Sequence, residues 1–177
     1  MPKLIVTGPE SSGKTTLCEQ LSDHFKIPFA KEFAREFLEN LGREYTQDDL
    51  LEIAKGQLKN ETPLPGGVIG RLNQQPSLHD TDLITIKIWS EYKYGKCEKW
   101  ILEQIEIQKS ETRIYLLCKP DIPWEAHPQR ENPNNRDELF EIYKTELGGL
   151  GYTYFVVEGA ERNLKTTKYL KDILSNC

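Results

Sequence analysis

The sequence predicts an α/β fold in which helices flank one parallel β-sheet of about five strands. Three observations support this prediction. Short apolar runs alternate with helical patterns along the chain. A glycine-rich segment, Gly8–Thr15, lies directly between an apolar run and a helical pattern. The length of 177 residues, with 37% hydrophobic and 29% charged residues, suits one domain with a sizeable core. We therefore treat residues 1–177 as a single domain.

Five short segments have the composition of buried strands. A parallel sheet is expected because each is separated from the next by at least one helical pattern. The expected strands are Leu4–Val6, the stretch near Phe29–Phe33, Ser77–Asp80, Ile114–Cys118 and Tyr154–Val157.

Helical periodicity fills most of the remaining chain. Thr46 is a suitable N-cap for the helix that begins there. Gly148-Gly149 is expected to stop the helix that begins at Arg136. The expected helices are Thr15–Phe25, Ala34–Leu41, Thr46–Leu58, Leu83–Tyr92, Lys96–Lys109, Arg136–Leu147 and Leu164–Leu174.

Two segments interrupt this alternation and are predicted to be loops. Thr62–Pro76 is rich in Pro, Gly and Asn, and Pro120–Asn135 contains four prolines. Loops of this length in a compact domain are usually either functional lids or disordered segments. We expect residues 120–136 to form a lid.

The glycine-rich segment has the spacing G-x-x-x-x-G-K-[ST], and its position between strand and helix is that of a phosphate-binding loop in the P-loop NTPase fold. Backbone N–H groups of such a loop surround a polyphosphate, and the helix N-terminus adds a favourable dipole. Lys14 is expected to reach the β- and γ-phosphates, and the Thr15 hydroxyl to bind Mg²⁺. The predicted nucleotide-binding residues here are Gly8, Glu10, Ser11, Ser12, Gly13, Lys14, Thr15 and Thr16.

Two carboxylates follow the strand Ser77–Asp80. In an open parallel sheet, ligands bind outside the carboxyl ends of the strands, so Asp80 and Asp82 are candidates to hold Mg²⁺ and to orient or deprotonate an attacking hydroxyl. If the chain stays extended, both side chains point to the same side. The alternative for Asp82 is that it caps the helix beginning at Leu83.

Other candidates lie at the same predicted edge. Glu32 and Arg35 could bind sugar hydroxyls, or form a surface ion pair. Arg130 and Arg136 could close over the triphosphate and stabilise charge on the transferred phosphoryl group, although loop arginines are often only solvated. Trp124 could stack on a flat ring, or belong to the core.

Composition excludes several other classes. The net charge of −5 argues against a broad nucleic-acid surface. No apolar segment is long enough for a membrane span, and the histidines lack metal-ligand spacing. The start of the chain shows no secretory signal pattern, and the cysteines form no C-x-x-C pair. We expect a cytoplasmic protein whose partner is a small molecule; its oligomeric state is left open.

Four motifs occur in an order that is specific to one group of enzymes: Gly8–Lys14, Glu32-Phe33-Ala34-Arg35, His79–Leu83 and Asp121-Ile122-Pro123-Trp124. On these motifs the chain resembles the ribosylnicotinamide kinase domain of the NadR family over nearly its whole length. The sequence departs from the family pattern between Leu64 and Leu78, where Gly66–Gly70 interrupts the expected helix and strand.

The resemblance implies transfer of the γ-phosphate of ATP to the 5′-hydroxyl of nicotinamide riboside, which yields nicotinamide mononucleotide in NAD salvage. It implies that Lys14 and Thr15 bind phosphate and Mg²⁺, that Asp80 is the catalytic acidic residue, and that Glu32 and Arg35 contact substrate. Arg130 and Arg136 are implied to be lid residues. Two alternatives stay open: a kinase for another nucleoside or a vitamin alcohol, and a regulatory nucleotide-binding switch.

Overall fold

The computed structural model describes residues 2–61 and 76–175. Its centre is a five-stranded, fully parallel sheet with the strand order β2-β3-β1-β4-β5. The strands are β1 (Lys3–Thr7), β2 (Phe29–Ala30), β3 (Ser77–Asp80), β4 (Arg113–Cys118) and β5 (Tyr154–Val157). This confirms the predicted fold class.

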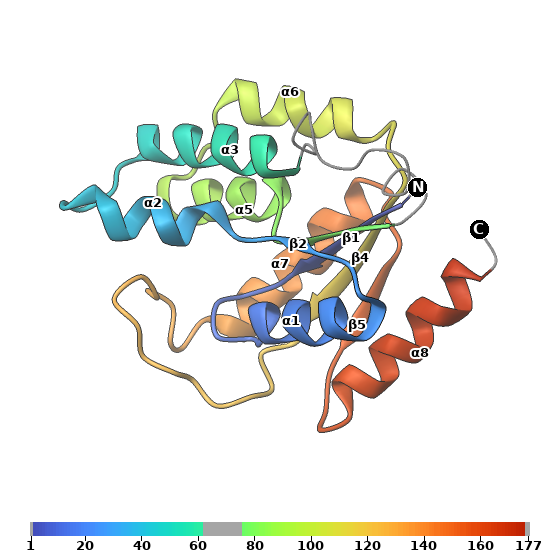
Figure 1. Cartoon of the computed structure of the whole chain (residues 1–177). Coiled ribbons are helices and arrows are strands. Elements are labelled where there is room, and N and C mark those ends of the chain that lie inside the picture. The colour runs from blue at the N-terminus through green and yellow to red at the C-terminus, as the bar shows by residue number, and fades with distance from the viewer. Residues whose placement is uncertain (1, 62–75, 176–177) are drawn as a thin grey trace.

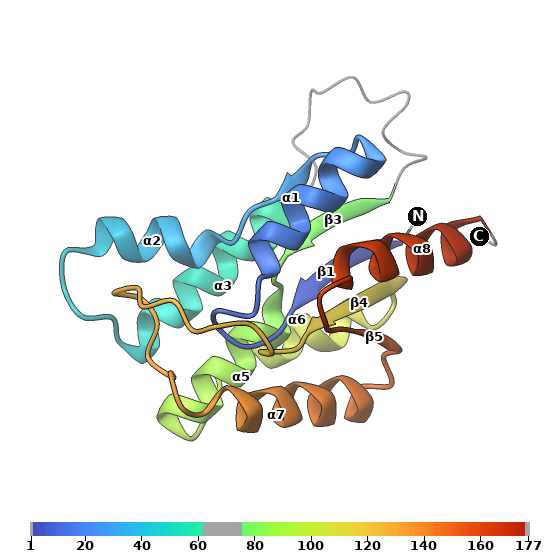
Figure 2. The same cartoon turned by 90° about the horizontal axis from the view of Figure 1, so that it is seen from below.

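Helices cover both faces of the sheet. They are α1 (Lys14–Phe25), α2 (Phe33–Leu41), α3 (Gln47–Glu61), α5 (Leu83–Tyr94), α6 (Lys99–Gln108), α7 (Arg136–Gly149) and α8 (Arg162–Leu174). Figures 1 and 2 show α1 and α8 side by side on one face, with α3, α5 and α6 on the other. No helix in the described part of the chain is both long and apolar enough to cross a membrane.

Alternating side chains of the central strand β1 build the two cores. Leu4 and Val6 pack with Leu17 and Leu21 of α1 and with α8. Ile5, between them, belongs to the other core, which contains residues of α3, α5, α6 and α7. Because side chains alternate across a strand, an apolar β1 can be buried on both faces.

Several element boundaries differ from the sequence prediction. β2 ends at Ala30, since Phe33 already begins α2. The helix α7 continues through Gly148 and Gly149 and is capped at Leu150, so these glycines do not stop it. At the start of α3, the Asp49 carboxylate accepts hydrogen bonds from the Thr46 N–H (2.7 Å) and hydroxyl (3.0 Å). Thr46 therefore precedes the helix, as predicted, but Asp49 supplies the capping oxygen.

The segment between β4 and α7 contains no helix or strand, as predicted. It extends past the N-terminal end of α1 toward α2 (Figures 1 and 2). The predicted loop Thr62–Pro76 lies outside the described residues, except for Pro76. The departure from the family pattern at Gly66–Gly70 also lies outside them.

Candidate active site

The turn between β1 and α1 needs glycine at two positions. Gly8 has a φ of 135°, and a Cβ atom there would lie 2.5 Å from the carbonyl oxygen of Cys118 on β4. Gly13, at the N-cap of α1, has a φ of 82°. L-residues with side chains rarely adopt these conformations. The sequence motif therefore folds into the tight turn that a phosphate-binding loop requires.

Lys14 lies across this loop. Its Nζ donates hydrogen bonds to the carbonyl oxygens of Gly8 (3.0 Å) and Pro9 (2.9 Å), and the Ser12 hydroxyl donates to Pro9 O (2.7 Å). The ammonium group is thus held at the mouth of the turn, next to the N-terminus of α1. Both features favour an anion at this place.

Thr15 and Asp80 meet beside the loop. The Thr15 hydroxyl donates a 2.7 Å hydrogen bond to Asp80 Oδ2. Asp80 is only 1% exposed. Its burial, reinforced by the negative charge of Glu32, raises the pKa of Asp80 to about 6, while Lys14 and the Thr15 bond act in the opposite direction. Asp80 is therefore a buried carboxyl group whose pKa lies closer to neutral pH than that of an exposed aspartate.

Gln57 of α3 fixes this edge of the sheet. Its side-chain Nε2 donates to the carbonyl oxygens of Asp80 (3.4 Å) and Thr81 (3.3 Å), and its Oε1 accepts from the Phe33 N–H (2.9 Å). One buried amide therefore joins the end of β3 to the start of α2. Glu32, which is the N-cap residue of α2, is brought to the same edge as Asp80, and its side chain makes no capping hydrogen bond.

The donor set beside the loop fits Mg²⁺. Asp80 Oδ1 is buried and has no hydrogen-bond partner among the described residues, and Thr15 adds a hydroxyl oxygen to the same place. Mg²⁺ prefers oxygen ligands, and it is usually bound by one or two protein groups together with substrate phosphates. In the described part of the chain, no group of three or more His, Cys, Asp or Glu side chains could hold a metal ion by itself.

A cavity of about 430 Å³ opens from the loop. One side is lined by Gly8–Thr16, and the opposite side by aromatic and aliphatic side chains of α2, α5 and α7. Two of the predicted substrate residues, Glu32 and Arg35, also line it. The residues that complete the opposite side are Ala34, Leu38, Thr85, Ile88, Trp89, Tyr92, Leu139 and Tyr143.

The segment between β4 and α7 covers the loop. The Arg130 guanidinium, which lines the cavity, donates to Ser11 Oγ (3.4 Å) and to the Glu125 carbonyl. The Glu125 N–H also donates to Ser11 Oγ (3.0 Å). Glu10 accepts from the Glu131 N–H (2.8 Å) and from Asn132 Nδ2 (2.6 Å). The predicted lid is therefore attached to the loop at two of its residues.

Arg136 and Trp124 do not line the cavity. Arg136 Nη1 donates to the carbonyl oxygens of Ser11 and Ile122, both at 3.0 Å. Its guanidinium carbon lies 5.6 Å from the centre of the Trp124 ring. The two side chains thus lie close together, with Arg136 bonded to the backbone of the loop at Ser11. Their geometry supports a role in holding the loop and the lid rather than the ligand contacts expected from sequence.

Asp82 is the clearest departure from the sequence expectation. Thr81 has a φ of 67°, so the chain does not stay extended after Asp80, and the two carboxylates do not share a side. Asp82 caps α5 by accepting from the Ile84 N–H (3.1 Å), and it also accepts from Tyr115 Oη (2.7 Å). We therefore withdraw the catalytic and substrate-binding assignment of Asp82.

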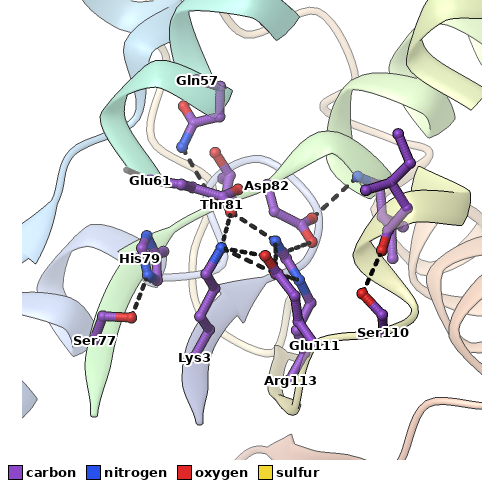
Figure 3. A network of polar contacts seen from close by, with 12 residues as sticks. Lys3, Gln57, Glu61, Ser77, His79, Thr81, Asp82, Ser110, Glu111 and Arg113 are labelled. Carbon is purple, nitrogen blue, oxygen red and sulfur yellow. Dashed lines mark hydrogen bonds and ion pairs between the residues drawn. The ribbon is translucent and has the colours of Figure 1, made fainter. Parts of the chain in front are cut away.

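Figure 3 shows where Asp82 points instead. Its Oδ2 pairs with Arg113 Nη1 at 3.2 Å, and Arg113 Nη2 pairs with Glu61 at 2.7 Å; these three side chains are at most 1% exposed. Lys3 and Glu111 extend the network toward the surface. It ties the start of β4 to the end of α3, away from the phosphate-binding loop.

Sequence reasoning missed several residues of the site. Arg162, at the start of α8, donates to Ser12 O (2.8 Å) and pairs with Asp121, which accepts from the Gly159 N–H (2.7 Å). Trp89 and Tyr92 could have been noticed as aromatic residues three apart on one helix. No sequence signal marks Tyr143, which also lines the cavity.

A glycine loop at the carboxyl edge of a parallel sheet, with a threonine and an aspartate meeting beside it, defines a P-loop nucleotide-binding protein with the fold of the P-loop kinases. A family model agrees with this class. The model described as an AAA domain matches residues 3–163, and the chain belongs to this AAA domain family. No curated protein matches the sequence.

Several solved structures resemble the chain. NadR in complex with NR has 25% sequence identity and a TM-score of 0.67, over 90% of this chain and 44% of NadR. NadR with NAD and AMP-PNP has 24% identity and a TM-score of 0.62, over 92% and 46%. Deoxyadenosine kinase from M. mycoides with bound dATP has 11% identity and a TM-score of 0.53, over 96% and 98%. The chain thus spans less than half of the NadR chains, and nearly all of the deoxyadenosine kinase.

Proposed function

We propose that this protein transfers the γ-phosphate of ATP to the 5′-hydroxyl of nicotinamide riboside and forms nicotinamide mononucleotide. The observation that carries the proposal is that one cavity is lined both by the phosphate-binding loop and by the aromatic wall. A transfer reaction needs donor and acceptor sites in one enclosed space. Similarity to NadR in complex with NR, at 25% identity, supports nicotinamide riboside as the acceptor.

The loop would hold the nucleotide. Backbone N–H groups of residues 8–16 would surround the phosphates, and Lys14 would turn from the loop carbonyls to the β- and γ-phosphate oxygens. Thr15 and Asp80 are the residues that would hold Mg²⁺. When bound there, the ion would neutralise negative charge on the phosphates during transfer.

The opposite wall suits a flat cationic ring with an attached sugar. Trp89, Tyr92 and Tyr143 contribute aromatic rings to the lining, and the faces of such rings attract cations such as a pyridinium ring. Glu32 and Arg35 supply a carboxylate and a guanidinium for ribose hydroxyls. This arrangement would direct the 5′-hydroxyl toward the loop.

In the transfer step, the 5′-oxygen of the acceptor forms a bond to the γ-phosphorus, and the bond from that phosphorus to the β–γ bridging oxygen breaks, which releases ADP. We assign the hydroxyl proton to Asp80, because this buried carboxylate lies next to the loop and its Oδ1 has no hydrogen-bond partner among the described residues. Arg130, which contacts Ser11 Oγ, would stabilise the charge on the transferred group.

The test is a phosphate-transfer assay with ATP and Mg²⁺ over a panel that contains nicotinamide riboside, adenosine, deoxyadenosine, cytidine and thiamine. Product mass is the readout, and Lys14→Ala is the control for contaminating kinases. We expect nicotinamide mononucleotide as the main product. A monophosphate of a different panel member alone would keep the kinase assignment and replace the acceptor. No product from any member would overturn the proposal.

A further inference from the structure

A tyrosine outside the cavity connects its two sides. Tyr45, in the loop between α2 and α3, accepts hydrogen bonds at its hydroxyl from Trp89 Nε1 (2.9 Å) and Lys93 Nζ (2.7 Å). The same hydroxyl donates to Glu131 Oε2 (2.6 Å). A phenol has one donor and two acceptor positions, so all of its hydrogen-bonding capacity is used. Burial raises the pKa of Tyr45 to about 12, which keeps the proton that it donates.

The partners of Tyr45 are also held to one another. Lys93 Nζ pairs with Glu131 Oε1 at 2.8 Å and lies 3.9 Å from the centre of the Tyr45 ring. The Tyr45 and Trp89 rings meet edge to face, with centroids 5.0 Å apart. Glu131 therefore has one carboxylate oxygen fixed by Lys93 and the other by Tyr45.

This cluster reaches both halves of the cavity. Trp89 lines the acceptor side, and Glu131 lines the lid side. The Glu131 N–H donates to Glu10 Oε2 in the phosphate-binding loop (2.8 Å). A continuous series of contacts, Trp89–Tyr45–Glu131–Glu10, thus runs from the aromatic wall to the loop, although Tyr45 itself is not among the cavity-lining residues.

We propose that Tyr45 is a positioning residue that fixes the Trp89 indole and the lid residue Glu131 in one arrangement, so that acceptor binding and lid closure over the nucleotide occur together. The proposal rests on the proposed function insofar as the aromatic wall binds the acceptor. An indole whose N–H is bonded keeps one orientation, and a fixed Glu131 keeps the lid in contact with Glu10. Together they would favour transfer to the acceptor over hydrolysis by water.

The first test compares Tyr45→Phe with Tyr94→Phe. The first variant keeps the ring and removes the hydroxyl. The second removes a hydroxyl that donates to the backbone of the same loop, at Tyr45 O (3.4 Å), but leaves the series intact. For Tyr45→Phe we expect the acceptor KM to rise about tenfold, more ATP to be hydrolysed per transfer, and the KM for ATP to rise by a smaller factor of about three- to fivefold. For Tyr94→Phe all three should stay within about twofold of the parent.

The second test does not need an acceptor. Hydrogen exchange of residues 130–132 is measured with AMP-PNP bound, in the parent, Tyr45→Phe, Glu131→Gln and the double variant. We expect faster exchange in each single variant and little further change in the double variant, because the two residues act through one contact. If the wild type phosphorylates no nucleoside, the proposed function fails, while this exchange result still decides whether Tyr45 holds Glu131.

A purely structural Tyr45 would give a different pattern. Tyr45→Phe would then lower the melting temperature and leave the acceptor KM, the ratio of hydrolysis to transfer and the exchange of residues 130–132 at their parental values. That result, or additive effects of Tyr45→Phe and Glu131→Gln, would overturn the proposal.

Discussion

Thr15 and Asp80 are joined by a 2.7 Å hydrogen bond, although 65 residues separate them in the sequence. Thr15 lies in the first turn of α1, and Asp80 is the last residue of β3. The bond can form because β1 and β3 are parallel neighbours. The end of β3 and the loop that follows β1 therefore lie at the same edge of the sheet. The closeness of these two residues is the structural basis for the assignment of Asp80.

The two aspartates near this edge should therefore respond differently to substitution. We expect Asp80→Asn to lower kcat by about 100-fold or more, since it removes a charge beside the phosphates. Asp82→Asn should instead lower the free energy of unfolding by about 2–3 kcal/mol, because Asp82 pairs with the buried Arg113. Turnover and urea unfolding of both variants are the measurements.

Tyr115→Phe is the control for this comparison, because it removes one donor to Asp82 without changing any charge. It should lower stability and leave kcat of the folded protein near the parental value. A large loss of kcat in Asp82→Asn with unchanged stability would contradict our account.

Lys14→Ala should nearly abolish turnover. The ammonium lies at the mouth of the loop, bonded to Gly8 O and Pro9 O, where it would meet the terminal phosphates. Loss of such a group costs about 100- to 1000-fold in kcat. Steady-state kinetics and a melting curve measure the effect, and a variant that keeps parental turnover would show that Lys14 does not serve the reaction.

Gly56→Ala should destabilise the protein by about 1–3 kcal/mol, because a methyl group there would lie 2.2 Å from the Phe33 ring. Phe33 begins α2, directly after Glu32, so the acceptor KM should rise as well. Gly148→Ala is a matched helical control, since nothing lies within 4 Å of its added Cβ atom. It should be neutral or stabilising, and equal denaturation midpoints for the two variants would contradict this prediction.

His79 should make the protein acid-sensitive. Burial, with the charges of Lys3 and Arg113, lowers the pKa of His79 to about 4, below the unfolded value of 6.5. Between these values the unfolded chain binds more protons, so the free energy of unfolding falls as pH falls from 6.5 to 4, by about 3 kcal/mol in all.

His79→Gln should remove this dependence. The raised pKa of Asp80 acts in the opposite direction over a similar range, so the informative quantity is the difference between parent and variant. Urea unfolding at pH 7, 5.5 and 4.5 measures it, and parallel curves for parent and variant would refute the role of His79.

Arg162→Gln should raise the KM for ATP by about five- to tenfold, because Arg162 holds Ser12 O of the phosphate-binding loop and pairs with Asp121. The KM for the acceptor should not change. Lys168→Gln removes the same charge from an exposed position on the same helix and serves as the control. Equal effects of the two substitutions on the KM for ATP would contradict this prediction.

The parts of the site that are local in sequence could be predicted. Gly8–Thr15 forms the expected turn, and Asp80 ends the expected strand at the ligand edge. Glu32 and Arg35 lie in the cavity wall as the pattern indicated. The aromatic wall was not predicted, because Trp89 and Tyr143 come from helices whose periodicity shows only that each has a buried face.

By itself, the sequence determined that the sheet is parallel, in which order strands and helices follow along the chain, and where the phosphate-binding loop lies. These features depend on hydrophobic periodicity and on glycines at fixed spacing. Only the tertiary structure decided that Asp82 turns toward Arg113, that Arg162 reaches Ser12, and that Tyr45 joins Trp89 to Glu131. The physical reason is that such contacts depend on the packing of distant segments and, at Thr81, on one backbone angle of 67° that no residue pattern encodes.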